Sequence, residues 1–119
     1  MKWKPISEAE IIMLINDSYE RMNFEQRRFW DAVKIYPEKW KQKPWGNKGK
    51  GFWVVAIIGN SVVYYNDIEE GFNRSCYIKY GEIKDYYCNQ SELEWEIQVV
   101  MDEIRDGYPS GYKAGPPIP

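Results

Sequence analysis

Residues that could carry chemistry gather in one short glycine-containing segment. Asp67, Glu69 and Glu70 supply carboxylates, and Asn66 and Asn73 supply amide oxygens. Such hard oxygen ligands suit Ca²⁺ or Mg²⁺, but their spacing does not match the alternating ligands of a helix-loop-helix calcium site. We therefore interpret the segment as a solvated inter-strand loop, or as a charged contact patch for a basic partner protein, and expect no metal.

The chain contains no histidine. Histidine is the usual general base near neutral pH, so a Ser-His-Asp or Cys-His arrangement is excluded. Two cysteines, Cys76 and Cys88, make no zinc site alone. They could face each other across a hairpin with a turn near Glu82, although a reducing cytosol favours free thiols. We expect no catalytic residue and no cofactor, and hence a chain that is not an enzyme.

A second candidate segment interleaves cations with indole rings. Trp40 and Trp45 lie among the lysines Lys39, Lys41, Lys43, Lys48 and Lys50. This combination binds single-stranded nucleic acid, with phosphates on lysine and bases on aromatic faces. The alternative is that both tryptophans fold under the loop and pin it to the core. A net charge of −2 and the absence of a ribonucleoprotein aromatic motif argue against nucleic acid as the partner.

Tyrosines recur along the expected strands, at Tyr64, Tyr65, Tyr77, Tyr80, Tyr86 and Tyr87. Tyrosine favours strands, which explains most of them. An outward-facing tyrosine is also typical of protein interfaces. We include Tyr65, which precedes the acidic segment, among the candidate partner-binding residues.

The size and composition of the chain predict one ordinary domain. It has 119 residues, of which 17% are aromatic, so most of it must be ordered. Residues 1–51 carry 11 Lys and Arg against 7 Asp and Glu, a net +4, whereas residues 52–119 carry 5 against 11, a net −6. No apolar run approaches the ~20 residues of a membrane span, and no secretory signal is evident. We expect a cytoplasmic protein that does not enter a membrane.

Helical periodicity and capping residues predict three helices. Ser7 with Glu10 forms a capping box before a helix over 7–22, and Asn23 with Gln26 repeats the pattern before a second that ends ahead of Pro37. These two could also be one helix bent at Asn23. A third capping pair, Ser91 with Glu94, precedes an apolar helical face that ends at Gly107.

Strand signals lie between these helices. Residues 36–51 are rich in Pro and Gly and predict a long connection. The apolar run 52–58, the tight turn at Gly59-Asn60 and the run 61–65 predict a hairpin. Further strands are expected at 74–80 and 83–88. The order predicts an α+β fold, in which an antiparallel four-stranded meander packs with two N-terminal helices and one C-terminal helix. This single domain would span 1–107, and 108–119 would form a Gly/Pro-rich tail.

One stretch resembles a group of small bacterial proteins. It runs from Gly59-Asn-Ser-Val-Val-Tyr-Tyr-Asn-Asp-Ile-Glu-Glu-Gly-Phe-Asn-Arg-Ser, through Tyr80-Gly81-Glu-Ile, to Cys88-Asn-Gln-Ser-Glu-Leu. Some of these proteins are similar to the immunity proteins of polymorphic toxin systems. The resemblance covers about 50–95 and implies a cytoplasmic α+β protein that binds and blocks a toxin domain. It transfers no catalytic motif.

These observations favour a non-enzymatic module that binds another protein, and the resemblance implies, as its specific form, an immunity-type inhibitor of a bacterial toxin. The candidate partner-binding residues are Asn66, Asp67, Glu69, Glu70, Asn73, Trp40, Trp45 and Tyr65. The alternative is a domain that binds nucleic acid or a small ligand through the Lys/Trp loop 39–50. An enzyme that uses only the carboxylates Asp67, Glu69 and Glu70 is the third possibility.

Overall fold

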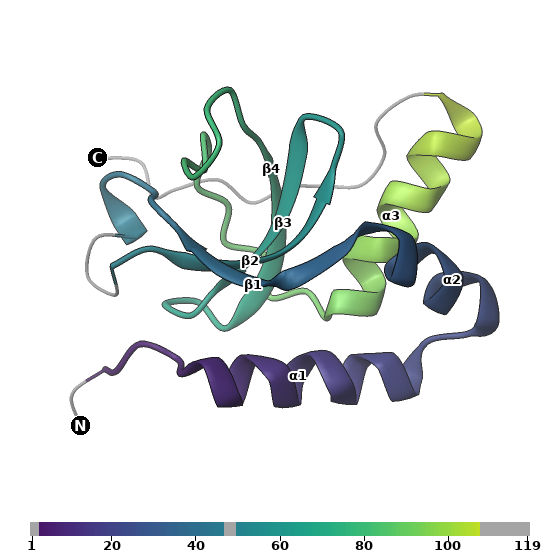
Figure 1. Ribbon diagram of the computed structural model, residues 1–119, viewed down its shortest axis with the longest axis horizontal. Helices are drawn as coiled ribbons and strands as arrows, with labels where there is room; N and C mark the ends of the chain where they lie inside the picture. Colours follow the sequence, from purple (N-terminus) through teal and green to yellow (C-terminus); the bar gives the residue numbers. More distant parts are fainter. Residues whose placement is uncertain (1–2, 47–49, 108–119) are drawn as a thin grey trace.

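The computed structural model describes residues 3–46 and 50–107 (Figure 1). The elements follow in the order α1 (Glu8–Arg21), α2 (Phe24–Val33), β1 (Lys34–Trp40), β2 (Phe52–Ile58), β3 (Ser61–Asn66), β4 (Gly71–Cys76) and α3 (Leu93–Asp106). The strands form one antiparallel sheet in sequence order. The expected α+β meander with two N-terminal helices and one C-terminal helix is confirmed. The tail expected at 108–119 lies outside the described residues, and none of the described helices is long and apolar enough to cross a membrane.

Local capping separates the first two helices. Ser7 Oγ accepts a hydrogen bond from the Glu10 amide at 3.1 Å, and the Glu10 carboxylate accepts one from the Ser7 amide. Asn23 and Gln26 make the same reciprocal pair at 2.8 and 2.9 Å. Because Asn23 caps a new helix in an extended backbone conformation, α1 and α2 are two helices rather than one bent helix.

The start of α3 differs from the capping prediction. Glu92, not Ser91, is the N-cap, and its side chain makes no cap hydrogen bond. Glu94 instead accepts from Arg21 Nε at 2.5 Å, and Glu92 accepts from Arg21 Nη2 at 2.9 Å. The predicted Ser91–Glu94 capping box is therefore wrong, because an ion pair to α1 takes the carboxylate. The helix ends as predicted, with Gly107 in the left-handed conformation.

The strands expected at 74–80 and 83–88 differ from those in the structure, and one strand lies where none was expected. The region 36–51, expected to be a connection, contains most of β1, in which Pro37 is tolerated because β1 is an edge strand with a register irregularity between Lys34 and Glu38. The strand expected at 74–80 begins and ends earlier, as β4. Residues 83–88 belong to no strand. The sheet thus reaches four strands by gaining β1 in place of 83–88.

Both faces of the sheet are buried, which explains the continuous apolar run in β2. Figure 1 shows α1 below the sheet and the segment that follows β4 above it. The helix-side core contains Ile11, Met22, Trp30, Val55, Ala56, Val63, Tyr65, Phe72, Leu93 and Ile97. The opposite core contains Trp40, Phe52, Val54, Val62, Tyr64, Ile83 and Tyr86. The second core forms because residues 83–88 lie across the face that the helices leave open.

This crossing segment, residues 82–90, is held by side chains of β3 and β4 rather than by a strand ladder. Three side-chain oxygens accept from its backbone amides, at 2.8 to 2.9 Å: Ser75 Oγ from Asp85, Tyr64 Oη from Tyr87 and Asn73 Oδ1 from Asn89. Two side-chain amides donate to its carbonyls: Asn66 Nδ2 to Tyr87 at 3.0 Å and Asn73 Nδ2 to Asn89 at 2.9 Å. From Asp85 to Asn89 every second residue receives these side-chain bonds, so this part of the segment keeps the extended alternation that predicted a strand.

The end of the crossing segment approaches β4 very closely. A Cβ on Gly71 would lie 2.1 Å from the Asn89 carbonyl oxygen. The next amide, of Phe72, donates to the Ser91 carbonyl at 2.9 Å. Gly71 is therefore required by the passage of a second backbone, and not by its own conformation.

Asn73→Ala tests the side-chain hydrogen bonds that hold the crossing segment to the sheet. Truncation removes two hydrogen bonds to the backbone of Asn89 beside the sheet, so the free energy of unfolding should fall by about 1–3 kcal/mol. The measurement is urea denaturation followed by circular dichroism. Asn60→Ala, in the exposed β2–β3 hairpin, is the matched control and should change stability by under about 1 kcal/mol. If both substitutions lower the free energy of unfolding equally, these hydrogen bonds do not stabilise the fold as described.

Candidate functional site

Strand register brings the two candidate segments to the same end of the sheet. Trp40 pairs with Phe52 at the end of β1, and Asn66 pairs with Gly71 at the end of β3. The acidic turn 67–70 and the Lys/Trp segment 41–46 both leave the sheet at this end. Lys39 is close enough to Asp67 to lower the pKa of its carboxyl group. Sequence analysis did not place these two segments together, because β1 was not expected.

Five of the eight predicted partner-binding residues are buried, and one of them, Asp67, also anchors the N-terminal segment. Asn66, Asn73 and Trp40 are almost completely covered, and Tyr65 packs with Phe72 at a ring-centroid distance of 4.9 Å. Asn66 Oδ1 also accepts from the amides of Ile68 and Glu69, which shapes the acidic turn from within. These side chains are committed to the fold and offer a partner almost no surface. Their polar or aromatic character reflects structural roles that one sequence does not reveal.

Asp67 anchors the N-terminal segment to the turn. Its Oδ2 accepts from the Ile6 amide at 2.8 Å, and its carbonyl accepts from Trp3 Nε1 at 2.9 Å. A second tryptophan, Trp53 of β2, donates from its Nε1 to the Ile6 carbonyl at 3.0 Å. Residues 3–6 thus form a strap over this end of the sheet. Sequence reasoning missed Trp3 and Ile6, since nothing in the local pattern links them to residues more than sixty positions away.

The second carboxylate oxygen of Asp67 has no hydrogen-bond partner. Asp67 is 8% exposed, and its Oδ1 is buried. Burial raises the pKa of Asp67, while the hydrogen bond from Ile6 and the charge of Lys39 oppose the rise. An unpaired buried acceptor of this kind costs about 1–3 kcal/mol. The carboxylate therefore holds the strap at a cost to stability.

The charges of carboxylates from three elements act on the Tyr65 hydroxyl. Burial, together with the charges of Glu70, Asp67, Glu92 and Glu10, raises the pKa of Tyr65 to about 12. Glu10 comes from α1, Asp67 and Glu70 from the turn, and Glu92 from the N-cap of α3. We call these four residues, together with Glu69, the acidic rim.

An exposed indole ring lies against the acidic rim, and a second is exposed on α3. Trp3 is 40% exposed and is held against the Asp67 carbonyl, and Trp95 is 58% exposed in the first turn of α3. Glu70 is exposed and Glu69 half-buried, so the turn presents charge to solvent. Glu70 has a φ of 60°, in the left-handed region that costs a side-chain-bearing residue about 1–2 kcal/mol.

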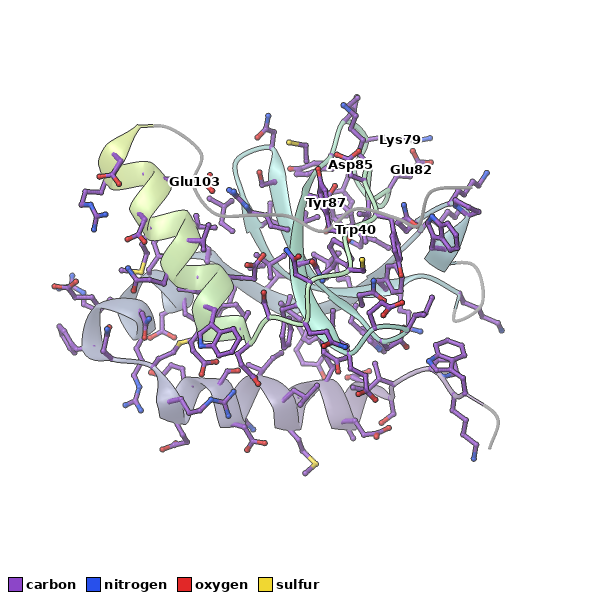
Figure 2. The ribbon with its side chains drawn as sticks, turned by 180° about the vertical axis from the view of Figure 1, so that it is seen from behind. Trp40, Lys79, Glu82, Asp85, Tyr87 and Glu103 are labelled. Carbon is purple, nitrogen blue, oxygen red and sulfur yellow. The ribbon has the colours of Figure 1, made fainter. Side chains whose placement is uncertain are left out.

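A basic and aromatic hollow lies on the opposite face of the sheet, at the same end. It has a volume of about 330 Å³ and is lined by Gln42, Lys43, Trp45, Lys84, Asp85, Tyr86 and Tyr87. Figure 2 shows Asp85 and Tyr87 on the crossing segment, over the sheet that carries Trp40. Trp45, a predicted site residue, is 37% exposed and packs on Tyr86 at a ring-centroid distance of 5.3 Å. Sequence reasoning identified Trp45 but missed Gln42 and Lys84.

A larger hollow lies elsewhere, between α1, the end of α2 and β1. It measures about 520 Å³, and its walls include Ile12, Ile15, Trp30 and Ile35. Its charged groups, Asp31 and Lys34, pair with each other at 3.0 Å. This apolar groove offers packing surface rather than chemistry.

Neither cysteine forms a disulfide. The hairpin that would have set Cys76 opposite Cys88 is absent, because 83–88 crosses the sheet instead of pairing with β4. Within residues 3–46 and 50–107, no group of three or more His, Cys, Asp or Glu side chains is placed to hold a metal ion. The carboxylates of the acidic rim are spread along a surface instead.

Comparison of the chain with protein-family models, with curated proteins and with solved structures finds no match. The arguments for function therefore come from the acidic rim and the hollow themselves.

The raised pKa of Asp67 predicts a pH-dependent stability. The folded-state value lies above the unfolded one, so ionised Asp67 opposes folding, and protonation removes that penalty. Asp67→Asn keeps an acceptor for the Ile6 amide but cannot titrate. The free energy of unfolding of the wild type, minus that of Asp67→Asn, should therefore increase as pH falls from about 7 to about 4.

Urea titrations across this pH range measure the difference. Glu10→Gln is the control of opposite sign, because hydrogen bonds from Ser7 lower the pKa of Glu10. For Glu10 the corresponding difference should decrease as the pH falls. A flat or decreasing difference for Asp67→Asn would contradict the assignment of an ionised, buried Asp67.

Proposed function

We propose that this chain is a non-enzymatic protein-binding module that uses the acidic rim to contact a basic partner protein. The observation that carries the proposal is that carboxylates of α1, the β3–β4 turn and the N-cap of α3 lie close enough for their charges to act on Tyr65, with exposed Trp3 held against the turn. Tryptophan is enriched at the centres of protein interfaces, and complementary charge accelerates and orients association. The surface therefore combines an apolar anchor with a charged border.

The most specific form of the proposal is an immunity-type inhibitor of a bacterial toxin. The resemblance of residues 50–95 to small bacterial proteins of that kind motivates it. A toxin that acts on nucleic acid needs a basic surface to bind phosphates, and an acidic inhibitor can cover that surface. This function requires no catalytic group of its own, and it would be exercised in the cytoplasm.

The hydrogen bonds that fix the backbone of the acidic turn support a binding role. Asn66 holds the turn from inside, and the strap 3–6 holds it from outside through Asp67. A surface whose backbone is fixed before contact loses little conformational entropy on binding. The proposal thus accounts for the strained backbone of Glu70 and for the buried carboxylate of Asp67, both of which lower stability.

A charge-reversal experiment tests the proposal. Glu69→Lys/Glu70→Lys reverses the two carboxylates that the turn presents to solvent, and Asp17→Lys/Glu20→Lys reverses two exposed carboxylates on α1 as a control. The purified, immobilised wild type and the control should retain the same basic protein from host lysate, and retention should weaken at high salt. The rim variant should lose it.

Growth provides the functional readout. Co-expression of the wild type with the retained protein should protect cells from its toxicity, and the rim variant should fail to protect them. Retention of no protein, or equal retention by both variants, would count against the proposal. Circular dichroism of each variant establishes that a loss of binding is not a loss of folding.

A further inference from the structure

The hollow between residues 42–45 and the crossing segment takes no part in the acidic rim. Its volume is about 330 Å³, and a neighbouring hollow of about 270 Å³ shares Lys43 and Lys84 with it. Pockets for small ligands in proteins start at about 300 Å³. The space therefore suits a ligand of modest size.

A buried acceptor without a partner lies in the wall of this hollow. Gln42 is only 3% exposed, and its side-chain Oε1 has no hydrogen-bond partner. Buried polar atoms in folded proteins are almost always paired, so an unpaired one signals a missing donor. Because Gln42 lines the hollow, rotation of its terminal amide can direct Oε1 to an N–H group of a bound ligand.

The charged groups of the hollow are of both signs. Lys43 and Lys84 are exposed cations on its wall, and Lys41 adds a third in the neighbouring hollow. Asp85 and Glu82 contribute carboxylates. A bare inorganic anion would use the lysines but be repelled by the carboxylates. A neutral ring would leave the lysines unused, so the lining suits a ligand that carries both an anionic group and hydrogen-bond donors.

Aromatic surface completes the lining. Trp45 is partly exposed and rests on the buried ring of Tyr86, with an angle of 37° between the ring planes. Tyr86 in turn packs on Phe52 of the core, so the indole has a firm support. A supported, partly exposed indole is a surface on which a nucleobase can stack.

From this lining we infer that the hollow binds a nucleotide. The base stacks on Trp45, its N–H groups donate to Gln42 Oε1 and the Asp85 carboxylate, and the phosphate lies between Lys43 and Lys84. A free nucleoside monophosphate and one nucleotide of a single strand present the same chemistry. This site is separate from the acidic rim, so either can fail a test while the other stands.

Isothermal titration calorimetry on the full chain tests the inference. The probes are the ribonucleoside 5′-monophosphates, the corresponding nucleosides, inorganic phosphate and a short single-stranded oligonucleotide. At least one monophosphate should bind saturably, and more tightly than its nucleoside or phosphate alone. Equal affinity for the oligonucleotide identifies a free nucleotide as the ligand, whereas tighter and strongly salt-dependent binding of the oligonucleotide identifies a strand.

Substitutions assign the contacts. Lys84→Gln and Trp45→Leu should each weaken binding about tenfold, since each removes a charge-assisted hydrogen bond or a stacking surface. Gln42→Met keeps the shape of the side chain, removes the acceptor, and should also weaken binding. Lys79→Gln, an exposed lysine outside the hollow, is the control and should bind as the wild type does.

Three results would overturn the inference. They are the absence of saturable binding by every nucleotide, phosphate binding as tight as that of the monophosphates, and an unchanged affinity in Lys84→Gln and Trp45→Leu. Lys84 and Trp45 are exposed, so these variants decide the matter even if Gln42→Met does not fold. The Glu69→Lys/Glu70→Lys variant should retain nucleotide binding.

Discussion

The fold depends on covering an apolar sheet face with a segment that has no strand or helix of its own. The helices bury one face of the sheet, and the crossing segment 82–90 buries the other. A buried, irregular backbone must find hydrogen-bond partners, because an unpaired amide or carbonyl costs as much as a lost hydrogen bond. Side chains of Tyr64, Asn66, Asn73 and Ser75 supply those partners on alternate residues.

This requirement determines which polar residues remain for function. Asn66 and Asn73 lie within a few residues of the carboxylates of the acidic turn, yet their side-chain amides bond to the crossing segment and the turn. The groups left over lie at the same end of the sheet. Glu69 and Glu70 lie on the turn, and Lys43, Lys84 and Trp45 line the hollow. The scaffold thus brings an acidic surface and a basic, aromatic one to a single end of the sheet.

The parts of the fold that sequence predicted are those set by neighbours along the chain. Ser7 with Glu10, Asn23 with Gln26, Gly59-Asn60 and Gly107 act within a few residues, and all behave as expected. Strand β1 was missed because Pro37 breaks strands in general and is tolerated here only at a sheet edge. The segment 83–88 was predicted to be a strand because its residues alternate as they do in a strand. In the structure, its alternate residues Asp85 and Tyr87 form hydrogen bonds with side chains of β3 and β4 and not with the backbone of a neighbouring strand. Sequence analysis also did not predict that the candidate residues Trp40 and Asn66 are buried. Their burial depends on residues that are distant in the sequence.

Features that lower stability collect at the end of the sheet where the proposed binding surfaces lie. Glu70 in a left-handed conformation, Asp67 with an unpaired oxygen and Gln42 with an unpaired oxygen all lie at this end. Each costs about 1–3 kcal/mol, whereas a small domain has a total stability of about 5–15 kcal/mol. Penalties of that size persist where the surrounding structure is needed for something else. Their concentration beside the acidic rim and the hollow, rather than along the helices, argues that this end of the sheet is the working surface of the molecule.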